Sequence, residues 1–282
     1  MLRDMSNQKY SNTNPFAHER NTNVNFNYVW DENDSNWIPQ SESSITSSYI
    51  LSNAKNFVHK FGSVKGISGS VSQDQPYTIC DQSSDVAVAS GKYIFPNDAG
   101  ESLTIVSSEN ADTEKIIVIG LNENFEEKEE EITLTGTTPL ALSGKWSRVF
   151  RAYNNGVNDL VGDISIKGST NTYAKILAGN NQTLMALYTI PADCTGYLLK
   201  YTITAQNTGS ASAIGFTIDI QVRQKDKVFR VLARTSAGTD YSIQEDYPFP
   251  LKLEPKSDII FNVISANGNN GSVNADFDIA LL

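Results

Sequence analysis

The chain is predicted to be all-β: an antiparallel β-sandwich or jelly roll that follows an extended, mostly irregular N-terminal arm. Apolar residues make up 39% of its 282 positions and charged residues only 19%. Asn, Ser, Thr and Gly take their place, and these residues fill the turns and solvent faces of sheets. Twelve Tyr and twelve Phe against three Met favour pleated surfaces over helix packing. From Tyr77 onward, short apolar and polar alternations recur between turn residues, as in a protein of many strands.

Residues 1–74 form the predicted arm. This segment is rich in Asn and Ser and has few apolar positions, so burial cannot easily offset the entropy of ordering it. A weak helix over Ser48–Phe61 is expected, although its apolar residues do not form a clean stripe.

An aromatic island interrupts this polar arm. Such clusters often dock on a neighbouring chain, because Trp and Tyr supply large contact area at low rotamer cost. Packing against the chain's own sheet is the alternative. The candidate assembly contacts are Phe26, Tyr28, Trp30, Trp37 and Ile38.

Residues 75–155 are predicted to be either a small β domain or the first part of the sandwich. Gly100–Ser107 and Trp146–Tyr153 are expected to be strands. Glu114–Ile119 and Glu129–Thr135 are separated by a loop that contains Gly and Asn, which predicts a hairpin.

Residues 156–282 are predicted to form a jelly-roll-like sandwich. Phe216, Ile218, Ile220 and Val222 alternate with polar residues and should lie on its core side. No helix-length amphipathic stripe interrupts this range, which disfavours a parallel α/β sheet. The expected strands are Val161–Lys167, Tyr173–Leu177, Leu184–Ile190, Tyr197–Ala205, Ile214–Val222, Val228–Arg234, Leu251–Leu253, Asp258–Ile264 and Ser272–Ile279.

Residues suited to catalysis or metal binding are sparse, so no catalytic residue, metal or cofactor is predicted. The two histidines, His18 and His59, both fall in the arm, which disfavours a His-based triad or a zinc site. The acidic run Glu123–Glu131 shares one wet surface, whereas catalytic carboxylates need separated, shielded environments. Asn267–Gly271 offers oxygen ligands without a calcium-loop pattern and is expected to be a turn.

Net charge limits the partners. Lys and Arg number 22 against 32 Asp and Glu, giving −10, so nucleic acid and anionic membrane surfaces are not expected partners. Cys80 and Cys194 are far apart in sequence and are expected to be free thiols. The apolar run Lys115–Gly120 is far shorter than the ~20 residues of a membrane span. The N-terminus lacks a signal-peptide core, which predicts synthesis in a cytoplasm without signal-peptide export.

Four groups of motifs, in the same order, resemble segments of the virion structural proteins of marine tailed bacteriophages, the cyanophages among them. Each motif alone is a turn signature, and the order makes them more specific. Asp193 stands where that family usually has Gly. The resemblance covers about residues 90–282 and leaves the arm unplaced. The motifs are Pro96–Thr113, Gly120–Phe125 with Glu131–Pro139, Arg148–Ile166 and Tyr188–Tyr197.

The resemblance implies a non-enzymatic structural component of the virion, as a capsid decoration or head fibre, or as a neck or tail accessory protein. Its expected partners are further copies of itself, with a trimer favoured, and other particle proteins of the capsid, portal, neck or tail. The alternative is a fibre module that recognises a host-surface glycan, with Tyr241, Tyr247 and Phe249 as candidate glycan contacts. A hydrolase, the third alternative, would need a cleft with two carboxylates about 5–10 Å apart.

Overall fold

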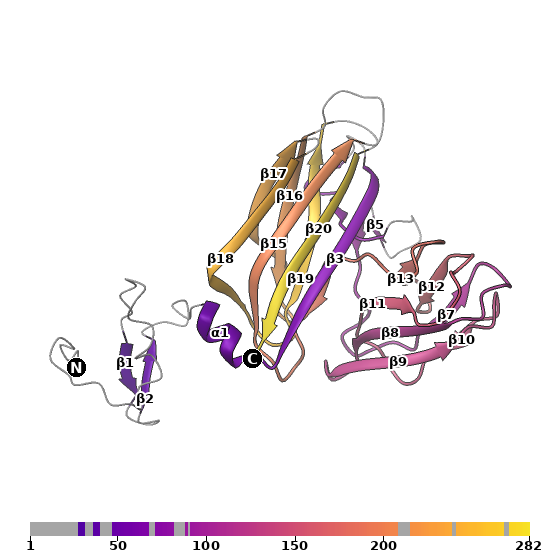
Figure 1. The fold of residues 1–282 in the computed structure, drawn as a ribbon, viewed down its shortest axis with the longest axis horizontal. Coiled ribbons are helices and arrows are strands. Elements are labelled where there is room, and N and C mark those ends of the chain that lie inside the picture. The colour runs from indigo at the N-terminus through magenta and orange to yellow at the C-terminus, as the bar shows by residue number, and fades with distance from the viewer. Residues whose placement is uncertain are drawn as a thin grey trace.

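The computed structural model describes residues 28–31, 36–39, 47–67, 71–81, 88–89, 91–207, 215–238, 241–267 and 271–282. Antiparallel strands dominate this part of the chain, which confirms the predicted all-β class and β-sandwich architecture. One short helix, α1 (Ser47–Asn53), lies at the foot of the larger of two β units in Figure 1. The smaller unit lies beside it.

The larger unit is a sandwich of two antiparallel sheets. Phe261 and Phe277 stack between the sheets with ring centroids 4.9 Å apart. The predicted alternation over 214–222 is confirmed: Phe216, Ile218 and Ile220 are buried, and Val222 packs partly buried against the core. One sheet has the order β18 (Tyr241–Leu253), β15 (Gly196–Asn207), β20 (Gly271–Leu281), β3 (Asn56–Ile67). The other has the order β14 (Leu187–Thr189), β19 (Asp258–Ala266), β16 (Gly215–Arg223), β17 (Arg230–Gly238), with β4 (Tyr77–Thr78) also paired to β19.

The smaller unit also has two antiparallel sheets, and Ile105, Val118, Trp146 and Ile164 contribute to its buried interior. The predicted hairpin between residues 114 and 135 is confirmed as β8 (Lys115–Leu121) and β9 (Glu127–Thr133). One of its sheets has the order β11 (Arg148–Asn154), β8, β9. The other has the order β10 (Leu140–Ala141), β7 (Thr104–Ser107), β12 (Ile164–Lys167), β13 (Thr172–Ile176). Two short pairs complete the set: β1 (Tyr28–Asp31) with β2 (Asn36–Pro39), and β5 (Val88–Ala89) with β6 (Lys92–Tyr93).

The strand pairing divides the chain differently from the sequence pattern. β3 falls within the range expected to be an arm, yet it pairs along its length with β20. The helix expected over Ser48–Phe61 ends at Asn53, and β3 occupies the rest of that range. β12 and β13 fall within the range 156–282 but belong to the smaller unit. The sequence does not indicate β3 as a strand because Gly62 and Gly66 interrupt its alternation, and the pairing with β20 decides its conformation.

Gly62 lies where β3 comes closest to the second sheet. A Cβ atom at this position would lie 2.1 Å from the backbone nitrogen of Ala186 and 2.5 Å from the carbonyl oxygen of Ile79. The Ala186 amide donates to the Ile79 carbonyl oxygen over 2.9 Å, so neither backbone atom can move without disturbing this hydrogen bond. The absence of a side chain at Gly62 therefore allows the sandwich to close along this side.

We expect Gly62→Ala to destabilise the protein by about 1–3 kcal/mol, because a methyl group must force two backbones apart. Gly238→Ala is the matched control, since a Cβ there meets no atom within 4 Å. Urea denaturation of both variants checks the difference. Equal stability of the two variants would contradict the close approach at Gly62.

Candidate functional site

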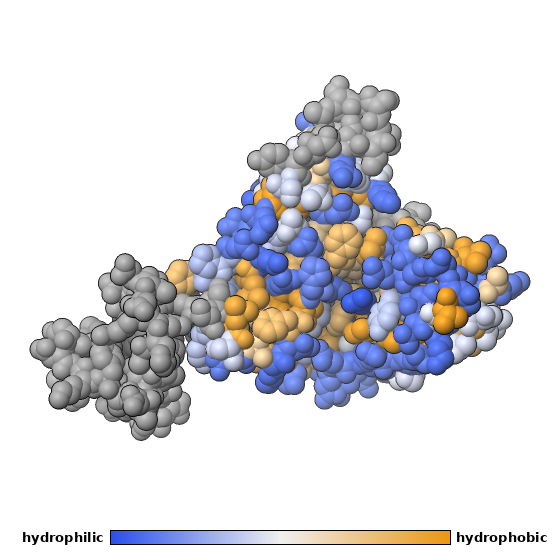
Figure 2. All heavy atoms as spheres, in the orientation of Figure 1, coloured by the Kyte–Doolittle hydropathy of each residue, from blue (hydrophilic) through white to orange (hydrophobic). Residues whose placement is uncertain are grey.

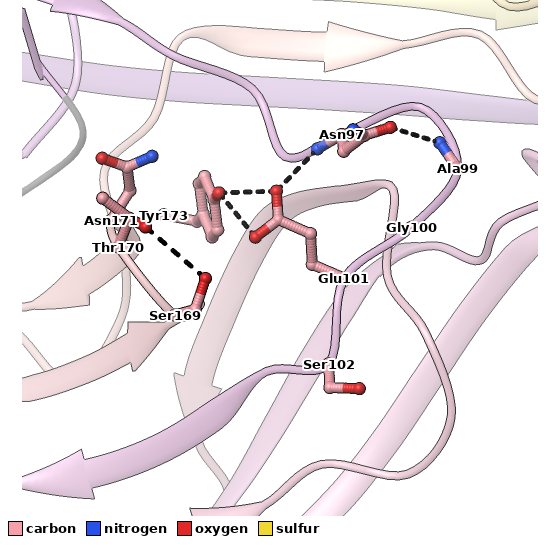
Figure 3. Close-up of a pocket in the computed structure, with 9 residues that line it drawn as sticks. All are labelled: Asn97, Ala99, Gly100, Glu101, Ser102, Ser169, Thr170, Asn171 and Tyr173. Atoms are coloured by element: carbon pink, nitrogen blue, oxygen red, sulfur yellow. Dashed lines mark hydrogen bonds between the residues drawn. The ribbon is translucent and has the colours of Figure 1, made fainter.

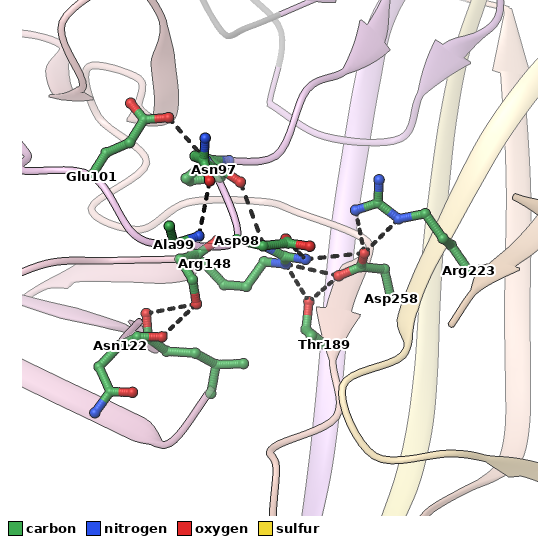
Figure 4. A network of polar contacts seen from close by, with 12 residues as sticks. Asn97, Asp98, Ala99, Glu101, Asn122, Arg148, Thr189, Arg223 and Asp258 are labelled. Atoms are coloured by element: carbon green, nitrogen blue, oxygen red, sulfur yellow. Dashed lines mark hydrogen bonds and ion pairs between the residues drawn. The ribbon is translucent and has the colours of Figure 1, made fainter. Parts of the chain in front are cut away.

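The two β units are joined by an ion-pair network around Arg148, the first residue of β11. Its side chain is 2% exposed, and Asp258 at the start of β19 is 1% exposed. The Nε atom of Arg148 donates to Oδ1 of Asp258 over 2.8 Å and to the hydroxyl of Thr189 over 3.1 Å. Arg223, at the end of β16, donates from Nε to the other carboxylate oxygen over 2.9 Å. Figure 4 shows Asp258 between the two guanidinium groups, so one carboxylate links both units.

Aromatic rings surround these guanidinium groups. The guanidinium carbon of Arg148 lies 4.9 Å from the ring centroid of Phe95 and 4.8 Å from that of Phe125. Arg223 lies 4.8 Å from the centroid of Phe229, which itself stacks on Phe95. The rings add cation–π attraction and displace water, which strengthens the ion pairs. Burial alone would lower the pKa of Arg148, but Asp258 and Asp98 raise it, so this guanidinium stays charged.

A tight turn at Asn97–Glu101 connects this network to a polar cavity. Asp98 accepts a hydrogen bond from Nη2 of Arg148 over 2.8 Å. The turn is closed by the Gly100 amide, which donates to the Asn97 carbonyl over 2.8 Å, and Gly100 has a φ of +76°. The amide of Asn97 donates to Oε1 of Glu101 over 2.9 Å. Arg148 thus fixes the turn at Asp98, and Glu101, the last residue of the turn, presents its carboxylate to the cavity.

The cavity lies between this turn and the connection that precedes β13, and its volume is about 400 Å³. The hydroxyl of Tyr173 donates to the Glu101 carboxylate, with 2.8 Å to each of its oxygens (Figure 3). Ser169, Thr170 and Asn171 line the opposite side. A Cβ atom on Gly168 would lie 2.6 Å from Oε2 of Glu101 and 2.7 Å from the Tyr173 ring, so only glycine permits this arrangement.

The cavity can form hydrogen bonds but holds only one carboxylate, that of Glu101. The two-carboxylate arrangement of glycosidases therefore does not occur among its lining residues. Burial raises the pKa of the Tyr173 hydroxyl, and this outweighs the hydrogen bond with Asn171, which lowers it. Tyr173 consequently keeps its proton at neutral pH and donates to Glu101.

The predicted assembly contacts lie mainly on β1 and β2. Tyr28 and Trp30 are on β1, Trp37 and Ile38 are on β2, and Phe26 lies outside the described residues. The backbone register sets Trp30 opposite Trp37 and Tyr28 opposite Pro39.

The predicted glycan contacts lie on β18, an edge strand of the larger sandwich. Tyr247 is half-buried against the core, with its ring 6.1 Å from that of Tyr201, while Phe249 is exposed. Neither Tyr247 nor Phe249 lines the cavity.

The histidines, the cysteines and the acidic run noted in the sequence lie elsewhere in the chain. His59 lies on β3, where its Nδ1 is 2.6 Å from the carboxylate of Asp278, and His18 lies outside the described residues. Cys80 and Cys194 are free thiols, buried and half-buried respectively. Glu127, Glu129 and Glu131 form the exposed face of β9. Across the described ranges, no group of three or more His, Cys, Asp or Glu side chains could hold a metal ion. No helix in this part of the chain is long and apolar enough to span a bilayer.

Sequence reasoning missed the residues that build this site. The sequence points to Arg148 only as part of a motif, and to Asp258, Glu101 and Tyr173 only as parts of expected strands. One local signal was available: Arg148 begins the strand that continues with Val149 and Phe150, where a charged side chain at a buried position needs a partner. The partner lies 110 residues away and gives no local signal.

Comparisons with known proteins do not assign a function to this site. No protein-family model matches the chain, and no curated protein is significantly similar in sequence. Among solved structures, the PBSX exported protein XepA is 9% identical, with 89% of this chain and 93% of that chain covered and a TM-score of 0.17. A protein of an infectious bursal disease virus particle is 10% identical, with 81% of this chain and 73% of that chain covered and a TM-score of 0.19. A mutant VP2 protein of that virus is 9% identical, with 81% of this chain and 73% of that chain covered and a TM-score of 0.18. No functional conclusion follows from likenesses at these scores.

We expect Asp258→Ala to destabilise the protein by about 3–5 kcal/mol, because it leaves the buried Arg148 without its main counter-charge. Asp98→Ala should cost less, since that side chain is partly exposed and removes only one of the Arg148 contacts. Urea denaturation of the two variants checks the order. An Asp98 variant that is less stable than the Asp258 variant would contradict the central place of Asp258.

Two other buried ionisable groups make stability depend on pH. Lys60 donates from Nζ to the carbonyl oxygen of Phe150 on β11. Burial, with a smaller effect of Arg151, lowers its pKa from 10.5 to about 7. Burial raises the pKa of Asp81 from 3.8 to about 7, against the opposing hydrogen bond from the Leu184 amide. From pH 7 to 10.5 the unfolded state holds an extra proton on Lys60, so stability rises with pH. From pH 3.8 to 7 the folded state holds an extra proton on Asp81, so stability falls as pH rises.

The combined contribution of these two groups should therefore be smallest near pH 7. We expect Lys60→Met to flatten the rise in unfolding free energy between about pH 7 and 10, and Asp81→Asn to flatten the fall between about pH 4 and 7. Urea unfolding measured at intervals across this range checks both effects. Profiles that keep the slopes of the unmodified protein would show that these groups do not set them.

Proposed function

We propose that this chain is a non-enzymatic structural component of a tailed-phage particle that forms a homo-oligomer through its N-terminal segment. The observation that carries the proposal is an exposed apolar patch where this segment joins the larger sandwich. This foot patch comprises Tyr49 and Leu51 of α1 with Phe57 and Phe61 of β3. Leu51 is 52% exposed and Phe57 is 50% exposed, which is costly for a surface that stays in water.

The foot patch is supported from beneath by the sandwich. Ile50 of α1 is fully buried against Tyr197 and Ala280, which fixes α1 on the sheet. Phe57 and Phe61 are exposed on β3 while Lys60 between them is buried, so the two rings face outward. Figure 2 shows apolar side chains gathered at this foot of the sandwich, close to α1. A patch of this kind, fixed in place and rimmed by polar residues, is typical of a protein–protein contact.

The proposed occupant of the foot patch is the β1–β2 hairpin of a neighbouring copy. An isolated two-stranded hairpin is marginally stable in water, so it gains from a surface that covers it. The pairing of Trp30 with Trp37 concentrates aromatic residues in a short segment. Eight backbone steps from Pro39 to Ser47 span at most about 28 Å, which is long enough for the hairpin to reach beyond its own α1 to a copy packed beside it.

A closed ring of such contacts, with a trimer favoured, would repeat one interface several times. Repetition makes individually weak contacts add, which suits a particle protein. The motifs Pro96–Thr113 and Tyr188–Tyr197 support placement in a tailed phage through their resemblance to virion proteins. The single carboxylate of the cavity supports a role without catalysis.

We expect the full-length protein to be an oligomer by sedimentation velocity, and two double variants to weaken its association at least about tenfold. One variant is Trp30→Ser with Trp37→Ser, in the hairpin. The other is Leu51→Lys with Phe57→Lys, in the foot patch. Point variants are preferable to removing residues 1–74, because that deletion also removes β3.

Val157→Lys is the matched control, because Val157 is 95% exposed and lies in the smaller unit. It should leave the association unchanged, and circular dichroism should show all variants folded. A monomeric full-length protein at about 100 µM would overturn the proposal, since mass action favours any specific oligomer at that concentration. Unchanged association of both double variants would also overturn it.

A further inference from the structure

We propose that the cavity between Glu101 and Tyr173 binds a neutral, polyhydroxylated ligand, such as a mono- or disaccharide. This goes beyond a structural role, because it gives the smaller unit a recognition site of its own. It also differs from the site expected on β18, since Tyr247 and Phe249 do not line the cavity.

The lining selects against other classes of ligand. Ala99 is the only aliphatic side chain of the lining, so an apolar ligand would gain little from burial there. No Lys or Arg lines the cavity, and Glu101 is a carboxylate, so a phosphate or a carboxylic acid would be repelled. The amide and hydroxyl groups of Asn171, Ser169 and Thr170 suit a ligand that both donates and accepts hydrogen bonds.

Glu101 provides the strongest acceptor in the cavity. A carboxylate has about four lone-pair positions. The single hydroxyl proton of Tyr173 is shared between the two carboxylate oxygens of Glu101. The Asn97 amide donates one further hydrogen bond to Oε1. Acceptor capacity therefore remains for a ligand. Hydrogen bonds from hydroxyl groups to a carboxylate are among the stronger ones, and a sugar offers adjacent hydroxyl donors.

The cavity is held in shape before any ligand arrives. Tyr173 is buried on β13, and its hydroxyl fixes the Glu101 carboxylate. The turn that carries Glu101 is held by Asp98 and Arg148, which belong to the ion-pair network between the units. Figure 3 shows Glu101 and Tyr173 directed toward each other, with Ser169 and Thr170 on the facing connection. A preformed site loses less entropy on binding than one that must order first.

The size of the cavity agrees with this class of ligand. Its volume of about 400 Å³ lies toward the lower end of the range for small-molecule sites. Because no aromatic ring of the lining is exposed for stacking, binding depends on hydrogen bonds alone. We therefore expect dissociation constants of about 1 mM or weaker, near −4 kcal/mol.

Saturation-transfer NMR on the full-length protein tests this, with maltose, lactose and diacetylchitobiose as separate probes and inorganic phosphate as the anionic comparison. At least one disaccharide should receive saturation, and phosphate titration should shift no protein signal. Glu101→Gln, which keeps the size of the side chain, should weaken binding at least about tenfold by removing the charge. Thr170→Trp, at the exposed rim, should abolish binding by blocking the entrance.

Thr138→Trp is the matched control, because Thr138 is an exposed turn residue of the same unit outside the lining. It should bind like the unmodified protein. The proposal is overturned if no disaccharide binds, if phosphate binds instead, or if either cavity variant binds as well as the control. Because the oligomer assay of the foot patch measures association, failure here leaves the assembly proposal separately testable.

Discussion

Asp258 accepts hydrogen bonds from two arginines that belong to different parts of the fold. Arg148 comes from the smaller unit and Arg223 from the larger sandwich, and both point at one buried carboxylate. Buried charges are stable only when their partners are fixed in good geometry. The two β units consequently have one well-defined arrangement at this point. The stacked rings of Phe95 and Phe229 cover the ion pairs.

The same network extends outward to the surface. Asp98 takes a third hydrogen-bonding group of Arg148, and three residues later Glu101 faces the cavity. A constraint at the junction therefore determines the position of a side chain that a ligand could reach. At the same end of the larger sandwich but on its other sheet, α1 and β3 present the foot patch, which does not include any residue of this network. Assembly and recognition, as proposed, would use separate surfaces of one chain.

Local patterns predicted most strands from β7 onward, because the alternation of apolar and polar residues in a strand involves only neighbouring positions. They predicted β8 and β9 as a hairpin and Phe216, Ile218 and Ile220 as core. They failed for β3, whose glycines and buried Lys60 break the alternation, and for most of β18, of which only Leu251–Leu253 was expected to be a strand. Both strands lie at the edges of one sheet, where a neighbouring strand on one side fixes the conformation.

By itself the sequence determined that this chain forms antiparallel sheets, since alternation and turn residues act over a few positions. It also determined which aromatic residues lie in the N-terminal segment. The tertiary structure alone decided that Arg148 meets Asp258, that Glu101 meets Tyr173, and that β3 completes a sheet with β20. These pairs are separated by 72 residues or more. Only the folding of the whole chain brings such groups together, so no local pattern records them.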